Sequence, residues 1–421
     1  MPALVRWRRQ LAMLLAVVGP GIIAANADND AGGITTLSVV GAHYGYQLLW
    51  VLFIITLSLA ITQEIGARTG AVTGKGLAAL IRENYGVRIT FFAMVVLLVA
   101  NLGTIIAEFA GVAAALELFD VPRVVSVPVA AAAVWLLVTR GDYKRVERVF
   151  LAFSLVYISY IVSAFLVRPD WGTVAASLVT PTPRLDAAYL ATLVALVGTT
   201  ITPWGQFFIQ AYVVDKGVTD KEYHVTRLEV YAGALLTDVI SLFIIVTAAV
   251  TLSTQGVRIE DASDAARALE PLAGPFARIV FAIGLLNASL LGAAVVPLST
   301  AYPICEAFGW EAGVSKSFRE APVFNGLYTF ALALGALAVL VPTLPLVTII
   351  LLSQTVNGVL LPIILIFAIR LASNRDIMGA HANGPVRNAV AWSTAVVLIV
   401  ATVALLATSV ILPIFGIEVG A

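Results

Sequence analysis

Residues 17–41 read VVGPGIIAANADNDAGGITTLSVVG, an apolar helix candidate with polar and glycine-rich sequence in its middle. Asp28, Asp30 and the flexible run AGG at 31–33 stand where a lipid-spanning helix would carry Leu or Val. An ionisable group at the bilayer centre costs about 2.5 to 3.5 kcal/mol on insertion scales, and backbone unwinds at that depth only where it lines a cavity. The stretch therefore predicts a cation site at the break of a membrane helix.

A second interrupted stretch lies in residues 188–217. It carries VGTTITPWGQ at 197–206, so that Pro203 and Gly205 break a hydrophobic helix in mid-span. Paired broken helices in the two halves of a membrane chain are typical of transporters with a midplane substrate site. We therefore expect a transport site at these two breaks.

The composition is that of an integral membrane protein. The 421 residues are 60% hydrophobic and 12% charged, and the mean hydropathy is +0.97. A soluble domain is only about 45–50% apolar. The 25 basic and 25 acidic residues balance, so no overall field favours nucleic acid. The single cysteine, Cys305, excludes an intrachain disulfide, and we expect it to be a buried apolar side chain.

Eleven membrane spans are predicted, each a hydrophobic stretch long enough to cross about 30 Å of hydrocarbon as a helix. The alternating pattern of a membrane β-barrel is absent. The spans cover about 12–41 (broken), 46–67, 89–118, 122–139, 146–167, 188–215 (broken), 228–253, 276–308, 322–342, 345–371 and 389–414. The first is expected to be retained rather than cleaved as a signal peptide, because no small-residue cleavage site follows it.

The lysines and arginines predict the orientation. With the N-terminus inside, nineteen of the 25 fall in inner segments and six in outer ones. The excess of inner positive charge predicts a plasma (inner) membrane protein with a cytoplasmic N-terminus and an extracellular C-terminus. Between the second and third spans, residues 70–86 predict a cytoplasmic amphipathic helix. The acidic outer loop 254–271 is interpreted as a solvated charge run.

The positions of the broken spans predict an internal repeat. They are the first and the sixth, and an odd number of spans per unit gives the two units opposite topology. We expect a single transmembrane transport domain over 1–421, with inverted repeats at about 12–167 and 188–371. An eleventh helix at about 389–414 follows the repeats.

Motifs spread over nearly the whole chain carry a resemblance. They are Gly19-Pro20-Gly21, Gly45-Tyr46 with Leu48-Leu49-Trp50, Arg68 with Val72-Thr73-Gly74-Lys75, Val296-Pro297-Leu298-Ser299-Thr300-Ala301-Tyr302 with Cys305-Glu306-Ala307-Phe308-Gly309, and Ser353-Gln354 with Leu361-Pro362. In these motifs the chain resembles the Nramp family of divalent-metal transporters. The resemblance implies an all-α polytopic membrane protein with a leucine-transporter-type fold, in which helices 1 and 6 are broken.

The chain departs from the family at the residues that bind metal. The family's Asp-Pro-Gly-Asn motif falls on residues 30–33, so Asp30 keeps the metal-binding aspartate while Gly33 replaces the asparagine ligand. The family's Met-Pro-His motif falls on residues 202–204, where Thr202 and Trp204 replace the thioether and the histidine. The resemblance therefore implies a site with fewer soft ligands.

The residues of the family's proton route are also changed. Its aspartate and glutamate in the third span fall on Ile105 and Glu108, and the ninth span, 322–342, lacks the arginine pair of proton-coupled members. The loss of the thioether leaves oxygen ligands, which suit Mg²⁺, an ion that keeps several waters. This pattern resembles the Nramp-related magnesium transporter branch.

The candidate ligands surround the first break. Asp30 is expected to bind the ion directly or through water. Asp28 is expected either to hold the hydrated ion from further away or to form a hydrogen bond with a neighbouring helix. Asn29, like Asn26, is either a ligand or a helix cap. Ala27 would act through its carbonyl oxygen, which unwound backbone leaves free.

Further candidates lie on three other spans. Thr199 would act through its carbonyl, whereas Thr202 either binds the ion or bonds its own helix. Gln354 and Asn357 share a helix face. The full set of candidate metal residues is Asp30, Asp28, Thr202, Gln354, Ala27, Thr199, Gly33, Asn29 and Asn357, with Glu108 and Trp204 as neighbours.

Glu108 either titrates with transport or makes a structural hydrogen bond. We expect the side chains of Glu64, Asp238 and Asn287 to form hydrogen bonds between helices.

These features predict import of largely hydrated Mg²⁺, with Mn²⁺ sharing the pathway, by alternating access. The ion is substrate, and no cofactor is expected. His43, His224 and His381 fall at span ends or in loops, so no intramembrane imidazole relays protons. Transport without protons would be driven by the membrane potential, worth about 2.3 kcal/mol per charge per 100 mV.

Other functions remain as alternatives. The first is a symporter, proton-coupled for Mn²⁺ or Fe²⁺ or cation-coupled for a small organic solute. A channel or receptor is a second. An intramembrane enzyme is disfavoured because both aspartates lie in one segment, without a Ser-His, HExxH or phosphate-loop pattern. We expect a monomer in the lipid bilayer, with no obligate protein partner.

Overall fold

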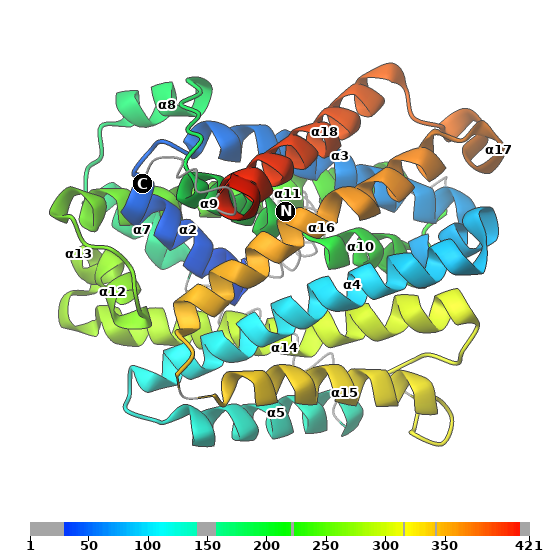
Figure 1. The fold of residues 1–421 in the computed structure, drawn as a ribbon, viewed down its shortest axis with the longest axis horizontal. Coiled ribbons are helices and arrows are strands. Elements are labelled where there is room, and N and C mark those ends of the chain that lie inside the picture. The colour runs from blue at the N-terminus through cyan, green and yellow to red at the C-terminus, as the bar shows by residue number, and fades with distance from the viewer. Residues whose placement is uncertain (1–28, 141–156, 220–222, 315, 342, 413–421) are drawn as a thin grey trace, which may run out of the picture.

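The computed structural model describes residues 29–140, 157–219, 223–314, 316–341 and 343–412. These residues form helices joined by short connections, and no strand occurs within them (Figure 1). The longer helices are α2 (Ala31–Tyr44), α3 (Leu49–Thr73), α4 (Leu77–Glu117), α5 (Arg123–Arg140), α7 (Tyr157–Leu166), α8 (Trp171–Val179), α9 (Ala187–Thr200), α10 (Pro203–Asp215), α11 (Tyr223–Thr251), α14 (Ala277–Phe308), α15 (Pro322–Val339), α16 (Leu346–Ser373) and α18 (Pro385–Leu406). The all-α prediction is confirmed.

The predicted spans correspond to these helices. Within the described ranges, nine helical segments are long and apolar enough to cross a membrane. They match nine of the eleven predictions, with α9 and α10 counted together as one interrupted span. Of the other two predicted spans, about 12–41 and 146–167, the structure describes the final parts, which are α2 and α7. Cys305 is buried and unpaired, as expected.

The sixth span is broken where the sequence indicates. Helix α9 ends at Thr200, and α10 begins at Pro203. Pro203 suits the first turn because its missing N–H would have no partner there. Thr202 caps the new helix by accepting a hydrogen bond from the Gly205 N–H at 3.1 Å. Local sequence therefore both ends one half-helix and starts the next.

Small residues let the central helices approach closely. Helix α4 packs against both α14 and α16, and it runs side by side with α14 (Figure 1). A Cβ added to Gly111 of α4 would lie 2.3 Å from Ser289 Oγ of α14 and 2.5 Å from the Cβ of Ala31. Without bulky side chains at such positions, backbones in a membrane pack against one another directly. Gly111 thus brings α2, α4 and α14 together at one point.

Glycine also joins α9 to α16. A Cβ on Gly198 would lie 2.2 Å from the Gln354 carbonyl oxygen and 2.3 Å from the Gly358 nitrogen. A Cβ on Gly358 would in turn lie 2.3 Å from the Val194 carbonyl oxygen. The contact is therefore between backbones rather than side chains, and it fixes the end of α9 beside the middle of α16.

The amphipathic helix predicted over 70–86 corresponds to the first part of α4 only from Leu77 on, because residues 70–73 still belong to α3. Gly86, with φ of 77°, bends the chain between this part and the third span. Such a positive φ is accessible to glycine at little cost. Glu306, near the end of α14, accepts a hydrogen bond from the Gly76 N–H at 2.9 Å and so caps the start of α4. The surface helix is therefore attached to the eighth span.

Removal of this cap should destabilise the protein moderately. Glu306→Ala leaves the first N–H groups of α4 without the carboxylate, and we expect a loss of about 1 kcal/mol in the free energy of unfolding. Thermal unfolding in detergent micelles measures the effect, with Glu270→Ala as the control, since Glu270 is exposed and 4.0 Å from its partner Arg267. Equal melting temperatures of the two variants would contradict the assignment of the cap.

Two segments that connect the spans differ from expectation. Helix α8 was not predicted; Asp170 caps it by accepting from the Gly172 N–H at 3.0 Å, and the helix packs along α3. The predicted solvated run 254–271 instead folds into short helices, η2 (Ser253–Gln255), α12 (Ala262–Ala266), η3 (Arg267–Leu269) and α13 (Glu270–Ala273). Their apolar residues, such as Leu269, are buried, while Glu260 and Asp261 remain exposed.

A buried ionic cluster lies at the other end of α3. Glu64 is 0% exposed and accepts hydrogen bonds from Arg68 Nε at 3.1 Å and from the Tyr223 hydroxyl of α11. Arg387 Nε of α18 lies 3.4 Å from the second Glu64 oxygen. The other partners of Arg68 are the His381 carbonyl and Asn383 Oδ1. The helix–helix bond predicted for Glu64 is therefore present, but it is part of an ion-pair network.

Candidate metal site

Asp30 stands at the start of α2. Its Oδ1 accepts a hydrogen bond from the Gly33 N–H at 2.8 Å, so the carboxylate caps the helix, and the side chain is only 3% exposed. A carboxylate is stabilised at this end by the helix dipole. Gly33 contributes its backbone N–H to Asp30, and it carries no side chain that could bind an ion.

Glu108 of α4 lies against Asp30. The two carboxyl groups contact each other, and Glu108 Oε2 is 3.4 Å from the Ala31 nitrogen. Glu108 is 0% exposed and fits over Gly292 of α14, where an added Cβ would lie 2.4 Å from the Glu108 carboxyl carbon. Two ionised carboxylates in such an interior repel each other unless a proton or cation lies between them. The Asp30–Glu108 pair can therefore hold either a shared proton or a cation.

Asn29 is held by two other helices. Its carbonyl accepts a hydrogen bond from the Tyr157 hydroxyl of α7, and its Oδ1 is 3.3 Å from the Ser241 hydroxyl of α11. Asn29 thus fixes the backbone immediately before α2. Neither Tyr157 nor Ser241 was predicted from the sequence, because both partners come from remote spans.

The amides of α16 reach the same region. Gln354 lies beside Gly32, where an added Cβ would be 2.0 Å from Gln354 Nε2 and 3.0 Å from Asp30 Oδ1. Gln354 Oε1 accepts from Asn357 Nδ2 at 3.0 Å, and Asn357 Nδ2 also donates to Thr104 Oγ1 at 2.9 Å. Gln354 Nε2 has no hydrogen-bond partner in the described part of the chain. A half-turn of this amide would present its oxygen toward Asp30.

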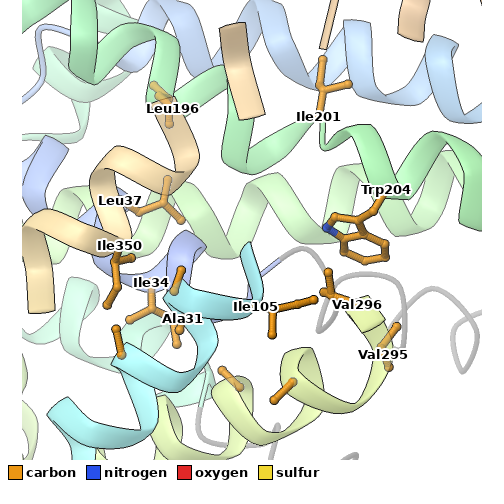
Figure 2. Packing of buried hydrophobic residues seen from close by; sticks show 14 of the residues in the cluster. Ala31, Ile34, Leu37, Ile105, Leu196, Ile201, Trp204, Val295, Val296 and Ile350 are labelled. Atoms are coloured by element: carbon orange, nitrogen blue, oxygen red, sulfur yellow. The ribbon is translucent and has the colours of Figure 1, made fainter. Parts of the chain in front are cut away.

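The second break contributes hydroxyl groups and an apolar wall. Thr199 is buried with no hydrogen-bond partner for Oγ1 among the described residues, whereas the Thr202 hydroxyl caps α10. Trp204 is buried, and Ile105 and Val296 point toward the same region of the core (Figure 2). Trp204 and Ile105, at positions where the family has polar groups, therefore form part of a dry side of the site.

The structure thus brings together predicted residues from four helices and both breaks. Asp30, Glu108 and Gln354 adjoin one another through the contacts above, and Gly198, the residue before Thr199, lies against the Gln354 carbonyl oxygen. The predicted Asp28 and Ala27, like Asn26, lie outside the described residues. Sequence reasoning missed Gly292, which is one of several small residues in α14 and makes room for Glu108.

The donors are hard oxygen ligands. Among the described residues, no group of three or more His, Cys, Asp or Glu side chains gathers as a metal cluster. One carboxylate pair with nearby amide and hydroxyl groups suits a cation that keeps several of its own waters. Soft metals would favour sulfur or imidazole, which these donors do not supply.

A buried carboxylate pair in a membrane protein with an interrupted helix, here at α9 and α10, is typical of a secondary transporter. The fold agrees with this class. A manganese transporter from Eremococcus coleocola matches with a TM-score of 0.74 at 19% identity, over 97% of this chain and 89% of that one. MhsT, in a complex with L-phenylalanine, matches with a TM-score of 0.61 at 17% identity, over 91% of this chain and 97% of that one. The predicted leucine-transporter-type fold is confirmed.

The sequence comparisons specify the family. The family described as natural resistance-associated macrophage protein-like, or Nramp, matches residues 21–408, and the chain belongs to it. A divalent metal cation transporter MntH of Deinococcus radiodurans is 29% identical over 93% of this chain and 89% of its own length. The MntH of Ralstonia nicotianae is 30% identical over 95% of this chain and 91% of its own length. The relatives are transporters, so the prediction that this chain is not an enzyme is confirmed.

Proposed function

We propose that this protein imports divalent cations, with Mg²⁺ as the main substrate and Mn²⁺ sharing the pathway, by alternating access. The observation that carries the proposal is the contact between the buried carboxyl groups of Asp30 and Glu108 at the start of α2. A divalent cation would neutralise both charges at once. The MntH relatives are named for divalent metal cation transport, which supports the same substrate class.

The preference for Mg²⁺ rests on the donors. Thr202 and Trp204 supply neither thioether nor imidazole, and the groups around Asp30 are carboxylate, amide and hydroxyl. Mg²⁺ loses water reluctantly and is bound through one or two carboxylates. Asp30 and Glu108 would hold it, with Gln354 and Thr199 bonding its waters. Asp28, Ala27, Asn29, Thr202, Gly33 and Asn357 remain proposed site residues.

The proposed driving force is the membrane potential. We place the protein in the plasma membrane with its N-terminus inside and its C-terminus outside, on the distribution of positive charge. An inside-negative potential then attracts a divalent ion with about 4.6 kcal/mol per 100 mV. Two inverted repeats, about 12–167 and 188–371, would rock against each other around the site, in a monomer.

A proton-coupled Mn²⁺ or Fe²⁺ symporter is the second candidate. Two observations favour it: the structural neighbour is a manganese transporter, and the Asp30–Glu108 pair can hold a proton in place of a metal. Against it, Ile105 replaces one carboxylate of the family's proton route. The two candidates differ in the ion accepted and in proton movement.

Reconstituted liposomes separate the candidates. The vesicles carry a Mg²⁺-sensitive dye or a pH dye, and an inside-negative potential is imposed. We expect entry of Mg²⁺, and of Mn²⁺ in a parallel sample, without acidification of the lumen. Failure of Mg²⁺ to enter, or Mn²⁺ entry accompanied by acidification, would reject the Mg²⁺ proposal in favour of the symporter.

A further inference from the structure

Helix α11 carries a buried carboxylate, Asp238, in addition to the Asp30–Glu108 pair of the candidate metal site. It is 4% exposed, and neither carboxylate oxygen has a hydrogen-bond partner in the part of the chain that the structure describes. The contact with another helix that was predicted for Asp238 is present, since the Thr56 hydroxyl of α3 faces it, but among the described residues it leaves both carboxylate oxygens without a hydrogen bond of normal geometry. A charged group inside a membrane protein needs compensation, because desolvating it without a partner is costly. If Asp238 is ionised, a cation bound beside its carboxylate would supply this compensation.

Two threonines adjoin Asp238, Thr56 of α3 and Thr237, which directly precedes it in α11. Thr56 of α3 faces Asp238, but its hydroxyl hydrogen is donated to the Leu52 carbonyl at 2.8 Å. Thr237 is also buried, and its Oγ1 has no hydrogen-bond partner among the described residues. A carboxylate beside two threonine oxygens is a donor set for a hard cation that retains water. The free lone pairs of these threonines can accept hydrogen bonds from such waters.

This oxygen group is connected to the candidate metal site. Ser241, whose hydroxyl contacts Asn29 Oδ1, also donates to the Thr237 carbonyl at 3.0 Å. Asp238 precedes Ser241 by about one helical turn, or about 4.5 Å along the axis. Helix α11 packs against both α2 and α3. In the proposed orientation α11 runs from the inside to the outside, so Asp238 lies on the cytoplasmic side of the Asn29 contact.

We propose that Asp238, with the oxygens of Thr56 and Thr237, forms a second, transient binding site for the transported divalent cation on its way to the cytoplasm. The inference rests on the proposed function, since it assigns this site to the same ion. A hydrated ion leaving Asp30 and Glu108 would next meet the Asp238 carboxylate. The second site lowers the cost of moving a divalent charge through the interior.

Counting bound ions tests the proposal. Purified protein in lipid nanodiscs is titrated with Mn²⁺, and free Mn²⁺ is measured by electron paramagnetic resonance. We expect two bound ions per wild-type chain and one for Asp238→Asn, which keeps the shape and removes the charge. The matched control is Asp376→Asn, the same change at an exposed carboxylate, which should leave two. Asp30→Asn should also leave one ion, bound at Asp238.

Each outcome decides a separate point. One ion in the wild type that Asp238→Asn retains and Asp30→Asn loses overturns the second site while the proposed function stands. No binding in the wild type overturns both. Two ions that Asp30→Asn leaves unchanged refute Asp30 as a ligand, and with it the path from Asp30 to Asp238.

Transport gives an independent readout. In liposomes Asp238→Asn should lower the maximal Mn²⁺ flux and leave the KM unchanged, because Asp238 acts after the ion has bound at Asp30. Should the variant fail to fold, Thr237→Val keeps the carboxylate and removes one oxygen. We expect it to weaken the second site by about tenfold, and an unchanged second dissociation constant would overturn the proposal.

Discussion

Asp30→Asn is expected to remove high-affinity metal binding and transport while the protein stays folded. The amide oxygen can still accept the Gly33 N–H and cap α2, so the main change is the loss of one negative charge. Loss of a buried charged partner costs about 3 kcal/mol, which is about a hundredfold in affinity. Mn²⁺ titration and uptake into liposomes measure the two effects.

The structure offers a matched control for this substitution. Asp170 caps α8 in the same manner, accepting from the Gly172 N–H, but it lies in the exposed connection after α7. Asp170→Asn should bind and transport as the wild type does. Near-normal uptake by Asp30→Asn would show that the ion does not depend on this carboxylate, and the site would have to be placed elsewhere.

Glu64→Ala is expected to cause the largest loss of stability. Arg68 is 2% exposed, and the change leaves its guanidinium group buried without the carboxylate that neutralises it. Breaking a buried ion pair by removing one partner costs about 3–5 kcal/mol. Detergent-solubilised protein should unfold at a clearly lower temperature or denaturant concentration. The bonds from Arg68 to His381 and Asn383 would not replace the lost charge.

Two comparisons make this result specific. Glu83→Ala removes a carboxylate that pairs with Lys75 where both side chains are about half exposed, and it should change stability by less than about 1 kcal/mol. Glu64→Ala combined with Arg68→Met should recover much of the loss, since no charge is then left unpaired. A single variant as stable as Glu83→Ala would mean that the network contributes little.

The spans and the breaks were predictable because their causes are local. Twenty or so consecutive apolar residues need no partner to be recognised, and Pro203 with the capping Thr202 before it favours a new helix start at that point. Asp30 was identified for the same reason, as a carboxylate in an apolar segment. The short helix α8 lacks the length that marks a span, and only its contact with α3 distinguishes it.

The partners within the site and the ionic cluster depend on the fold. Arg68 bonds residues more than three hundred positions away, and Ser241 contacts Asn29 across 212 positions. No periodicity along the chain encodes such pairs. The surroundings of Asp238 depend on the fold in the same way. In the described part of the chain the hydroxyl that faces it, that of Thr56, donates to the Leu52 carbonyl.

The contact between α9 and α16 has an evolutionary consequence. Gly198 and Gly358 each face backbone atoms, which cannot swing aside as a flexible side chain does. A larger residue at either position would push the helices apart and displace Gln354 and Thr199 together. Replacement of one glycine therefore cannot be compensated by trimming a neighbouring side chain. A larger residue at Gly198 or Gly358 could be accepted only if the whole helix moved first. We therefore expect both glycines to be kept in related sequences even where the residues around them have changed.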